Sequence, residues 1–254
     1  MINLDANKLN VFNSYLGQGN FKKASLVFFG NESGTSNNRT ADDIYNHIVR
    51  EMLDNKVINF KGAFTLRKPE CTPLNSVYIQ FMARFLLALE NNDEKWFKKL
   101  SKKNKLELNK YIKNKLNRNY SCNINLRPLP RSTERHWDYK INEKQYLKSF
   151  NFTSKNISIN QYNSNRLTYL INIFKYLFDK GTPIISIGDM KNKKSFFELF
   201  FNINLIELSL NKSYKIYYNL DYKLLLTNYW DNKNGLGLKG LHKIYKFIKD
   251  EKIF

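Results

Sequence analysis

Four short apolar runs punctuate the chain, and turn residues follow each of them at once. They cover residues 24–29, 121–126, 183–187 and 222–226. Apolar residues fill both alternating positions of these runs, which is typical of strands in a parallel sheet that is covered on both faces. The pattern predicts a four-stranded parallel sheet.

Helical patterns lie between these runs. Thr40 is a candidate cap for a helix that carries Ile44, Ile48 and Met52 on one face. Further amphipathic or apolar helices are predicted at 76–90, 96–116, 165–180 and 238–248. The alternation predicts an α/β fold, a three-layer α/β/α sandwich. We expect a single domain over residues 1–254, with a basic helical insertion at about 91–118.

Ligands of such sheets bind at the carboxyl ends of the parallel strands. The segments that follow the four runs are therefore expected to converge on one site. These segments are 30–35, 127–135, 188–194 and 227–237.

The net charge points toward polyanionic partners. The 254 residues include 42 Lys and Arg against 22 Asp and Glu, a formal net charge of +20. The chain is also rich in Lys, Asn, Ile, Tyr and Phe, the residues of A/T-rich codons, so codon composition is an alternative source of this charge. Charge alone therefore does not decide for a nucleic-acid partner.

Several classes of protein are excluded by what the sequence lacks. No run of 18 apolar residues and no signal peptide is visible, so we expect a cytoplasmic protein without a membrane partner. Cys71 and Cys122 are too few for a disulfide framework, a four-cysteine zinc site or an iron–sulfur cluster. His47, His136 and His242 have no ligand spacing. We expect no metal, no cofactor and a monomer.

Candidate chemistry begins after the first predicted strand. Gly30 permits a tight turn and a close backbone approach to a ligand, and Glu32 brings a carboxylate to the mouth of the sheet. The spacing of Gly30 and Gly34 fits neither a dinucleotide fingerprint nor a P-loop. The alternative is an ordinary turn with a solvated Glu32.

The second predicted strand holds two asparagines. The amides of Asn123 and Asn125 both donate and accept, which suits the hydrogen-bonding edge of a base. The alternative is that they are two more asparagines in an asparagine-rich chain. Basic residues follow and suit phosphate binding: Arg127, Arg131 and Arg135.

The last two segments add cations, an amide and aromatic rings. Lys191, Lys193 and Lys194 stand at a predicted helix start, where they favour phosphate unless they are merely solvated. Asn228 directly follows the fourth predicted strand. Tyr229 and Trp230 are candidates for an exposed wedge beside an extruded base, with Lys233 near the loop tip. The alternative is that Trp230 packs onto the C-terminal helix.

Together these segments resemble the uracil-DNA glycosylase superfamily. The matching pieces are 30–34, Asn123 or Asn125, Ile187-Gly188, and 227–230, in the order and strand context of that superfamily. Ser33 replaces the usual proline of the first motif, and the last motif lacks its histidine and proline. These departures concern the substrate more than the fold.

The resemblance implies a role for each matching residue. Glu32, assisted by Asn31, would orient a water and stabilise the positive charge that develops on the deoxyribose, and Asn228 would face the leaving base. Base-binding residues would be Gly30, Phe28, Phe29, Asn123 and Asn125. DNA-binding residues would be Ser33, Arg127, Arg131, Arg135, Lys191, Lys193, Lys194, Tyr229, Trp230 and Lys233.

The leading hypothesis is a monofunctional DNA glycosylase that flips out and hydrolyses an aberrant or modified base. The base would be uracil or a modified cytosine, in base-excision repair or in antiviral defence against phage with modified DNA. The DNA partner would be duplex or single-stranded. Two other classes stay open: a non-catalytic nucleic-acid-binding protein, and another α/β hydrolase that acts on nucleotides.

Overall fold

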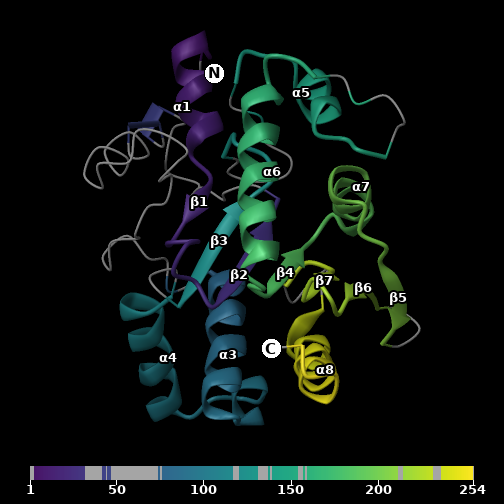
Figure 1. The fold of residues 1–254 in the computed structure, drawn as a ribbon. Coiled ribbons are helices and arrows are strands. Elements are labelled where there is room, and N and C mark those ends of the chain that lie inside the picture. Colours follow the sequence, from purple (N-terminus) through teal and green to yellow (C-terminus); the bar gives the residue numbers. More distant parts are fainter. Residues whose placement is uncertain are drawn as a thin grey trace.

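A single mixed sheet forms the centre of the computed structural model, with helices on both of its faces (Figure 1). The structure describes residues 3–31, 42–43, 45–46, 74, 76–116, 120–130, 137, 139–153, 157, 159–210, 214–230 and 236–253. Within them the strand order is β1-β3-β2-β4-β7-β6-β5. The strands are β1 (Gly17–Gln18), β2 (Leu26–Gly30), β3 (Ser121–Asn125), β4 (Ile184–Ile187), β5 (Ile206–Ser209), β6 (Lys215–Asn219) and β7 (Leu224–Thr227).

The four predicted strands form the parallel centre of this sheet. They are β3, β2, β4 and β7, and each pairs in parallel with its neighbours in that order. The expectation of only four strands is wrong, because β1, β6 and β5 extend the sheet with antiparallel pairs. These strands give little apolar signal, since β1 has two residues and β5 is mostly exposed.

The helices confirm most of the predicted pattern. The α-helices are α1 (Ala6–Ser14), α3 (Val77–Asn91), α4 (Lys102–Asn114), α5 (Glu143–Ser149), α6 (Ser164–Asp179), α7 (Met190–Phe201) and α8 (Gly237–Asp250). No pattern predicted α1 or α5. Of the helix expected from Thr40, the structure describes only residues 42, 43, 45 and 46, which are helical.

The long helix predicted over 96–116 is divided in two. A short 3₁₀ helix, η3 (Glu94–Phe97), precedes α4, and the chain between them is extended at Lys98. Ser101 starts α4 because its hydroxyl accepts the backbone N–H of Asn104 at 3.2 Å. Ser101 is thus the local signal that separates the two helices.

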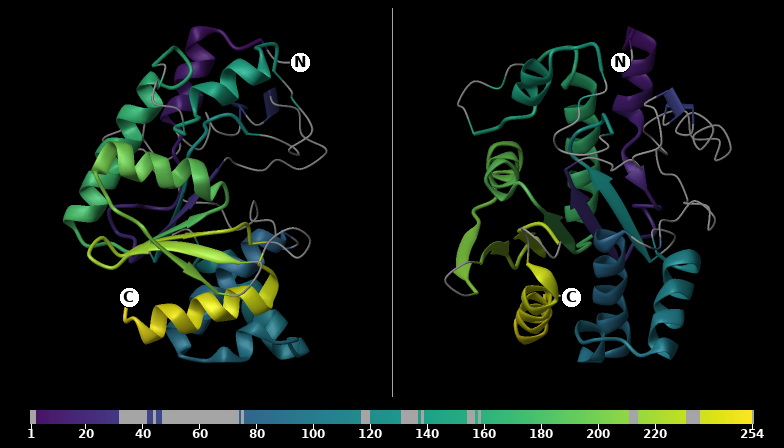
Figure 2. Two further views of the ribbon diagram at one scale, coloured as in Figure 1. Left: turned by 90° about the vertical axis from the view of Figure 1, so that its right-hand side faces the viewer. Right: turned by 180° about the vertical axis from the view of Figure 1, so that it is seen from behind.

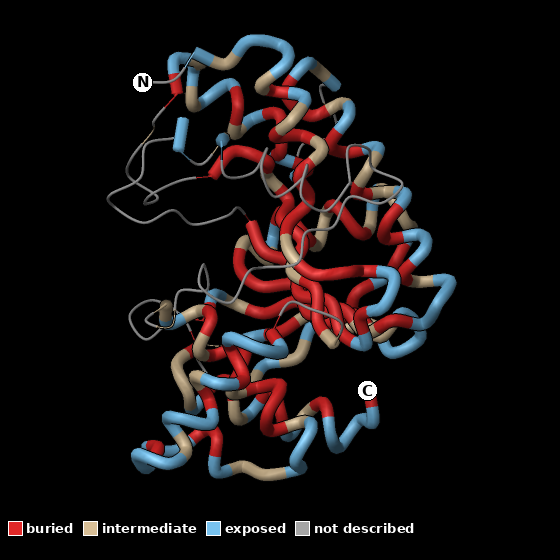
Figure 3. The backbone as a smooth tube through the Cα atoms, turned by 90° about the vertical axis from the view of Figure 1, so that its left-hand side faces the viewer, coloured by how far each residue is buried: buried red, intermediate tan, exposed pale blue. Residues whose placement is uncertain are grey.

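Alternate residues of β2, β4 and β7 enter two different cores, as the continuous apolar runs predict, whereas β3 contributes to one core only. Leu26 and Phe28 of β2 pack with α3, α4 and α8, which we call the α3-side core. Val27 and Phe29 pack with α6 and α7, which we call the α6-side core. Figure 3 shows the buried centre between the two outer layers, and Figure 2 shows α8 and the α6–α7 pair on opposite faces of the sheet.

A buried arginine joins the N-terminal segment to the carboxyl end of β3. Arg166 of α6 donates to the carbonyls of Asn13, Tyr15, Asn125 and Leu126. The side chain is fully buried, and burial lowers the pKa of its guanidinium to about 9, which leaves it charged at neutral pH. Arg166 therefore fixes α1, β1 and β3 relative to α6.

Replacing Arg166 with Lys is expected to destabilise the fold by about 3 kcal/mol or more, because one ammonium group cannot satisfy all four carbonyls. Urea unfolding followed by circular dichroism measures the loss. Arg84→Lys is the matched control, since Arg84 is only half-buried and donates to the carbonyls of Trp96 and Lys98 at 3.0 and 3.1 Å. Equal losses for the two variants would contradict this role of Arg166.

Candidate functional site

The carboxyl edge of the sheet has a topological switch point between β2 and β4. The chain leaves β2 for α3 on one face, whereas it leaves β4 for α7 on the other face. Adjacent parallel strands whose connections diverge in this way open a crevice for ligands beyond their carboxyl ends. Asn31 follows β2 at this point, and Gly188 follows β4.

Polar side chains converge on Gly30, the last residue of β2. A Cβ atom at Gly30 would lie 3.1 Å from Asn125 Oδ1, 3.6 Å from the Tyr78 hydroxyl and 3.7 Å from Asn123 Oδ1. Asn123 pairs with Phe28 and Asn125 with Gly30, so both amides lie on the α3 side of the sheet. We call Gly30, Tyr78, Asn123 and Asn125 the Gly30 cluster.

Tyr78 contributes a hydroxyl that stays protonated. It stands in the first turn of α3 and donates to Asn123 Oδ1 at 3.4 Å. Burial, reinforced by the nearby Tyr229 hydroxyl, raises the pKa of Tyr78 well above its ordinary value. The Gly30 cluster therefore combines two carboxamides with a neutral phenol, a set that can both donate and accept.

Gln18 is a further polar residue beside this cluster. It pairs directly with Asn123 across β1 and β3, so the two side chains share a face of the sheet. Its Oε1 atom is buried and accepts no hydrogen bond from any described residue. Sequence reasoning missed Gln18 and Tyr78 because neither follows one of the four predicted strands.

Tyr229 connects the carboxyl ends of three strands. It follows β7, its ring lies on Gly188 after β4, and its hydroxyl accepts a hydrogen bond from Asn31 Nδ2 after β2. Asn31 is 6% exposed, and its Oδ1 atom has no partner among the described residues. Tyr229 thus fixes the Asn31 amide and leaves one buried acceptor unsatisfied.

A buried lysine supports the same edge from the α6 side. Lys193 Nζ donates to the carbonyl of Phe29 at 2.8 Å and to that of Ile187 at 2.7 Å. It also lies 4.8 Å from the centre of the Phe29 ring. The prediction that Lys193 contacts DNA is wrong, because the side chain is fully buried and its ammonium group binds these carbonyls.

Three aromatic predictions are also wrong. Phe28 and Phe29 are fully buried in the α3-side and α6-side cores, so neither ring can stack on a base. Trp230 is 1% exposed and its ring centre lies 5.6 Å from that of Phe28. Its Nε1 atom donates to Thr227 Oγ1 at 2.9 Å, so Trp230 is a core residue rather than an exposed wedge.

The remaining predicted residues differ in what the structure says of them. Lys191 is exposed and Arg127 is half-buried. Lys194 pairs with Glu198 at 3.2 Å. Asn228 is half-buried, and its Oδ1 atom has no partner among the described residues. Five predicted residues lie outside the described part of the chain: Glu32, Ser33, Arg131, Arg135 and Lys233.

The described residues contain no group of three His, Cys, Asp or Glu side chains that could hold a metal ion. No helix among them has the length and apolarity needed to cross a bilayer. Comparison of the chain with protein-family models, curated proteins and solved structures finds no match. The geometry at the carboxyl edge of the parallel strands is therefore the basis for proposing a function.

Replacing Gly188 with Ala is expected to displace the Tyr229 ring. The new Cβ would lie 2.5 Å from Tyr229 Cε1, and Gly188 also has a φ of +74°. Gly181→Ala is the matched control, because Gly181 has a φ of +64° but no atom within 4 Å of such a Cβ. The control isolates the left-handed backbone strain of about 1–2 kcal/mol.

Thermal unfolding should show a larger loss of stability for Gly188→Ala than for Gly181→Ala. In a Tyr229→Ala background the excess should disappear, since the colliding ring is gone. An unchanged excess in that background would show that Tyr229 does not rest on Gly188.

Proposed function

We propose that this chain is a monofunctional DNA glycosylase that binds an extruded base at the Gly30 cluster. The observation that carries the proposal is the convergence of Asn123, Asn125 and Tyr78 on a glycine at the switch point of a parallel sheet. Carboxamides and a neutral phenol match the mixed donors and acceptors on the edge of a base. Glu32 comes two residues after Gly30 in the sequence.

The reaction requires charge of opposite sign at two places. The bond between the base and C1′ of the deoxyribose breaks, and its electron pair leaves with the base. A water oxygen bonds to C1′ and gives its proton to the Glu32 carboxylate, which also stabilises the developing positive charge on the sugar. The unsatisfied Oδ1 of Asn31 is suited to hold that water.

The departing base carries negative charge and is neutralised by a proton from solvent. Two groups at the carboxyl edge would stabilise the negative charge on the departing base. The ammonium group of Lys193 lies behind Gly30 and Gly188, one peptide away from each. Asn228 is the candidate donor on the β7 side, through its Nδ2 atom. The Lys193 charge and the Asn228 amide dipole would be in place before the bond breaks, so neither group has to reorganise during the reaction.

The placement of Lys193 also supports hydrolysis without lyase activity. A Schiff-base nucleophile must reach C1′ with a neutral amine. Lys193 is buried and donates to two backbone carbonyls, so it is unsuited to that role. Water is therefore the proposed nucleophile.

The surrounding basic residues would hold the phosphates that flank the extruded base. Arg127 and Lys191 are the described members, with Lys194 partly engaged by Glu198. Ser33, Arg131, Arg135 and Lys233 belong to the same proposal from the sequence. The exposed edge of Tyr229 (39% of the side chain) is the proposed contact with the neighbouring base pair.

The function is tested by incubating the protein with duplexes that contain uracil, hydroxymethylcytosine or glucosylated hydroxymethylcytosine. Alkaline cleavage then detects abasic sites. We expect abasic product from one of them, and a loss of at least about 100-fold in Glu32→Gln. The control Glu251→Gln makes the same chemical change at an exposed C-terminal position and should leave the rate unchanged.

Two outcomes would direct the assignment elsewhere. Salt-sensitive DNA binding without abasic product from any duplex would favour a non-catalytic binding protein. Hydrolysis of free nucleotides without any product from duplex DNA would favour another α/β hydrolase.

Gly30→Ala tests the base-binding cluster itself. A methyl group there would approach Asn125 Oδ1 to 3.1 Å and occupy the centre of the cluster. We expect at least a tenfold lower rate of abasic-site formation, with a thermal midpoint close to wild type because the strand accepts Ala. An unchanged rate would show that the base does not bind at Gly30.

A further inference from the structure

Helix α4 is attached to the protein through one face only. Leu108, Tyr111 and Ile112 are buried and pack in the α3-side core. The opposite face carries Lys102, Leu106, Lys110 and Lys113, which succeed one another at helical spacing and are all exposed. Leu106 is 71% exposed in the middle of this row. Figure 1 shows α4 on the outer side of α3.

The lysines of this face have no partners within the described part of the chain. Lys102, Lys110 and Lys113 take part in no ion pair and no hydrogen bond there, and the same holds for Lys103 and Lys105. Glu107 is the one acidic residue of α4. We call Lys102, Lys110 and Lys113 the α4 lysine row.

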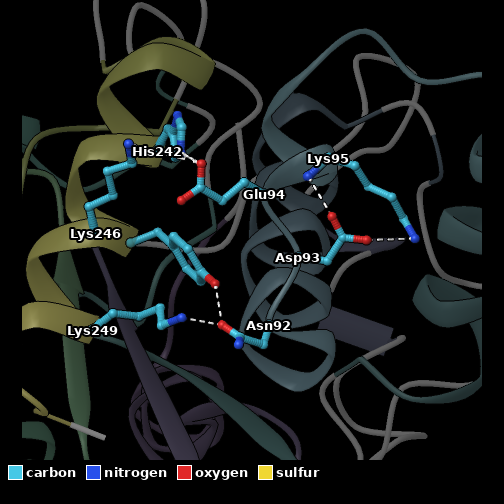
Figure 4. A network of polar contacts seen from close by, with 8 residues as sticks. Asn92, Asp93, Glu94, Lys95, His242, Lys246 and Lys249 are labelled. Carbon is cyan, nitrogen blue, oxygen red and sulfur yellow. Dashed lines mark hydrogen bonds and ion pairs between the residues drawn. The ribbon is translucent and has the colours of Figure 1, made fainter.

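Helix α8 provides a contrast with the same residue type. Lys246 Nζ lies 4.0 Å from Glu94, Lys249 donates to Asn92 Oδ1, and Lys243 donates to the carbonyl of Leu210 at 3.2 Å. Figure 4 shows Lys246 and Lys249 directed toward the turn that joins α3 to η3.

Three of the four α8 lysines thus contact other parts of the protein itself. Those of α4 have their charge available to a partner. A lysine excess that comes from codon composition would explain how many there are, but it would not explain this difference in arrangement.

We propose that the α4 lysine row is a second DNA-binding surface that contacts the phosphate backbone of the duplex beside the extruded base. The row extends over about 16 Å at 1.5 Å per residue, a length along which duplex DNA presents one charge per about 1.7 Å. The row and the Gly30 cluster lie on the same face of the sheet, because α4 packs on α3 and Tyr78 of the cluster stands in the first turn of α3. This inference rests on the proposed function for the identity of the polymer.

The test compares two triple variants with the same charge change. Lys102→Gln/Lys110→Gln/Lys113→Gln removes the row. Lys144→Gln/Lys148→Gln/Lys175→Gln removes three exposed lysines of α5 and α6. Each lowers the formal net charge of +20 by three. Fluorescence anisotropy measures the affinity of each full-length protein for an unmodified 24-base-pair duplex over a range of salt concentrations.

The α4 variant should bind at least about tenfold more weakly at low salt, and its slope of log K against log salt should be smaller by about 2–3. The α5–α6 variant should stay within about twofold of wild type. Lys102→Arg/Lys110→Arg/Lys113→Arg should restore the affinity, since a phosphate contact needs only the charge. Circular dichroism should show the same helix content in all variants.

Equal losses in the two glutamine variants would overturn the proposal, because net charge alone would then explain the binding. Loss of binding to phosphatidylserine vesicles with unchanged DNA affinity would overturn it in favour of a lipid surface.

The abasic-site assay separates this proposal from the proposed function. If wild type binds DNA through the row but forms no abasic product, only the enzymatic function fails. If abasic product forms and the α4 variant binds like wild type, only this inference fails.

Discussion

Two buried cations hold the carboxyl edge of the parallel sheet from behind. Lys193 joins carbonyls near the carboxyl ends of β2 and β4, those of Phe29 and Ile187, and Arg166 joins those of Asn125 and Leu126 to the N-terminal segment. Backbone carbonyls at strand ends need partners when they are buried, and these two side chains supply them. The positions of Asn123 and Asn125 in the Gly30 cluster depend on this arrangement, because both residues belong to β3, which Arg166 restrains.

The same arrangement gives the edge two chemically different sides. On the α6 side the cations face the cores and the backbone. On the α3 side the Gly30 cluster and Gln18 present amides and one hydroxyl, and Asn31 adds a further amide at the same edge. The side-chain oxygens of Gln18 and Asn31 are buried, and no described residue satisfies them. Buried polar atoms without partners are costly, so their persistence is typical of sites that bind a ligand or water. This asymmetry, more than the net charge, favours recognition of a polar, planar group such as a base.

The sequence predicted β2, β4 and β7 well because each is buried on both faces and is mostly apolar, whereas β3 alternates apolar residues with asparagines. It failed where tertiary contacts decide. Phe28 and Trp230 pack against each other in the α3-side core. The apolar run of β2 indicates the burial of Phe28, but no local pattern shows that the Trp230 ring is buried beside it. Lys193 resembles its neighbours Lys191 and Lys194 in sequence, yet helical periodicity turns it alone into the core. Strands β5 and β6 were missed because they alternate weakly and stay partly exposed.

The site residues differ in the same way: those on the predicted strands could be identified from the sequence, whereas one that is placed by a tertiary contact could not. Gly30 and Asn125 were identifiable because they end buried parallel strands, and such ends meet at one edge; Asn123 lies two residues before the end of β3. Tyr78 belongs to the start of a helix that follows a long connection, and its contact with Asn123 depends on how that helix returns to the sheet. Its part in the cluster was therefore not visible in the sequence.

The proposed function requires a base to enter the Gly30 cluster. A crystal structure of the Glu32→Gln variant bound to a duplex that carries the preferred base tests it most directly. We expect an extruded base whose edge lies within hydrogen-bonding distance of Asn123, Asn125 or Tyr78. A base that stays stacked in the duplex, or that binds away from Gly30, would contradict it.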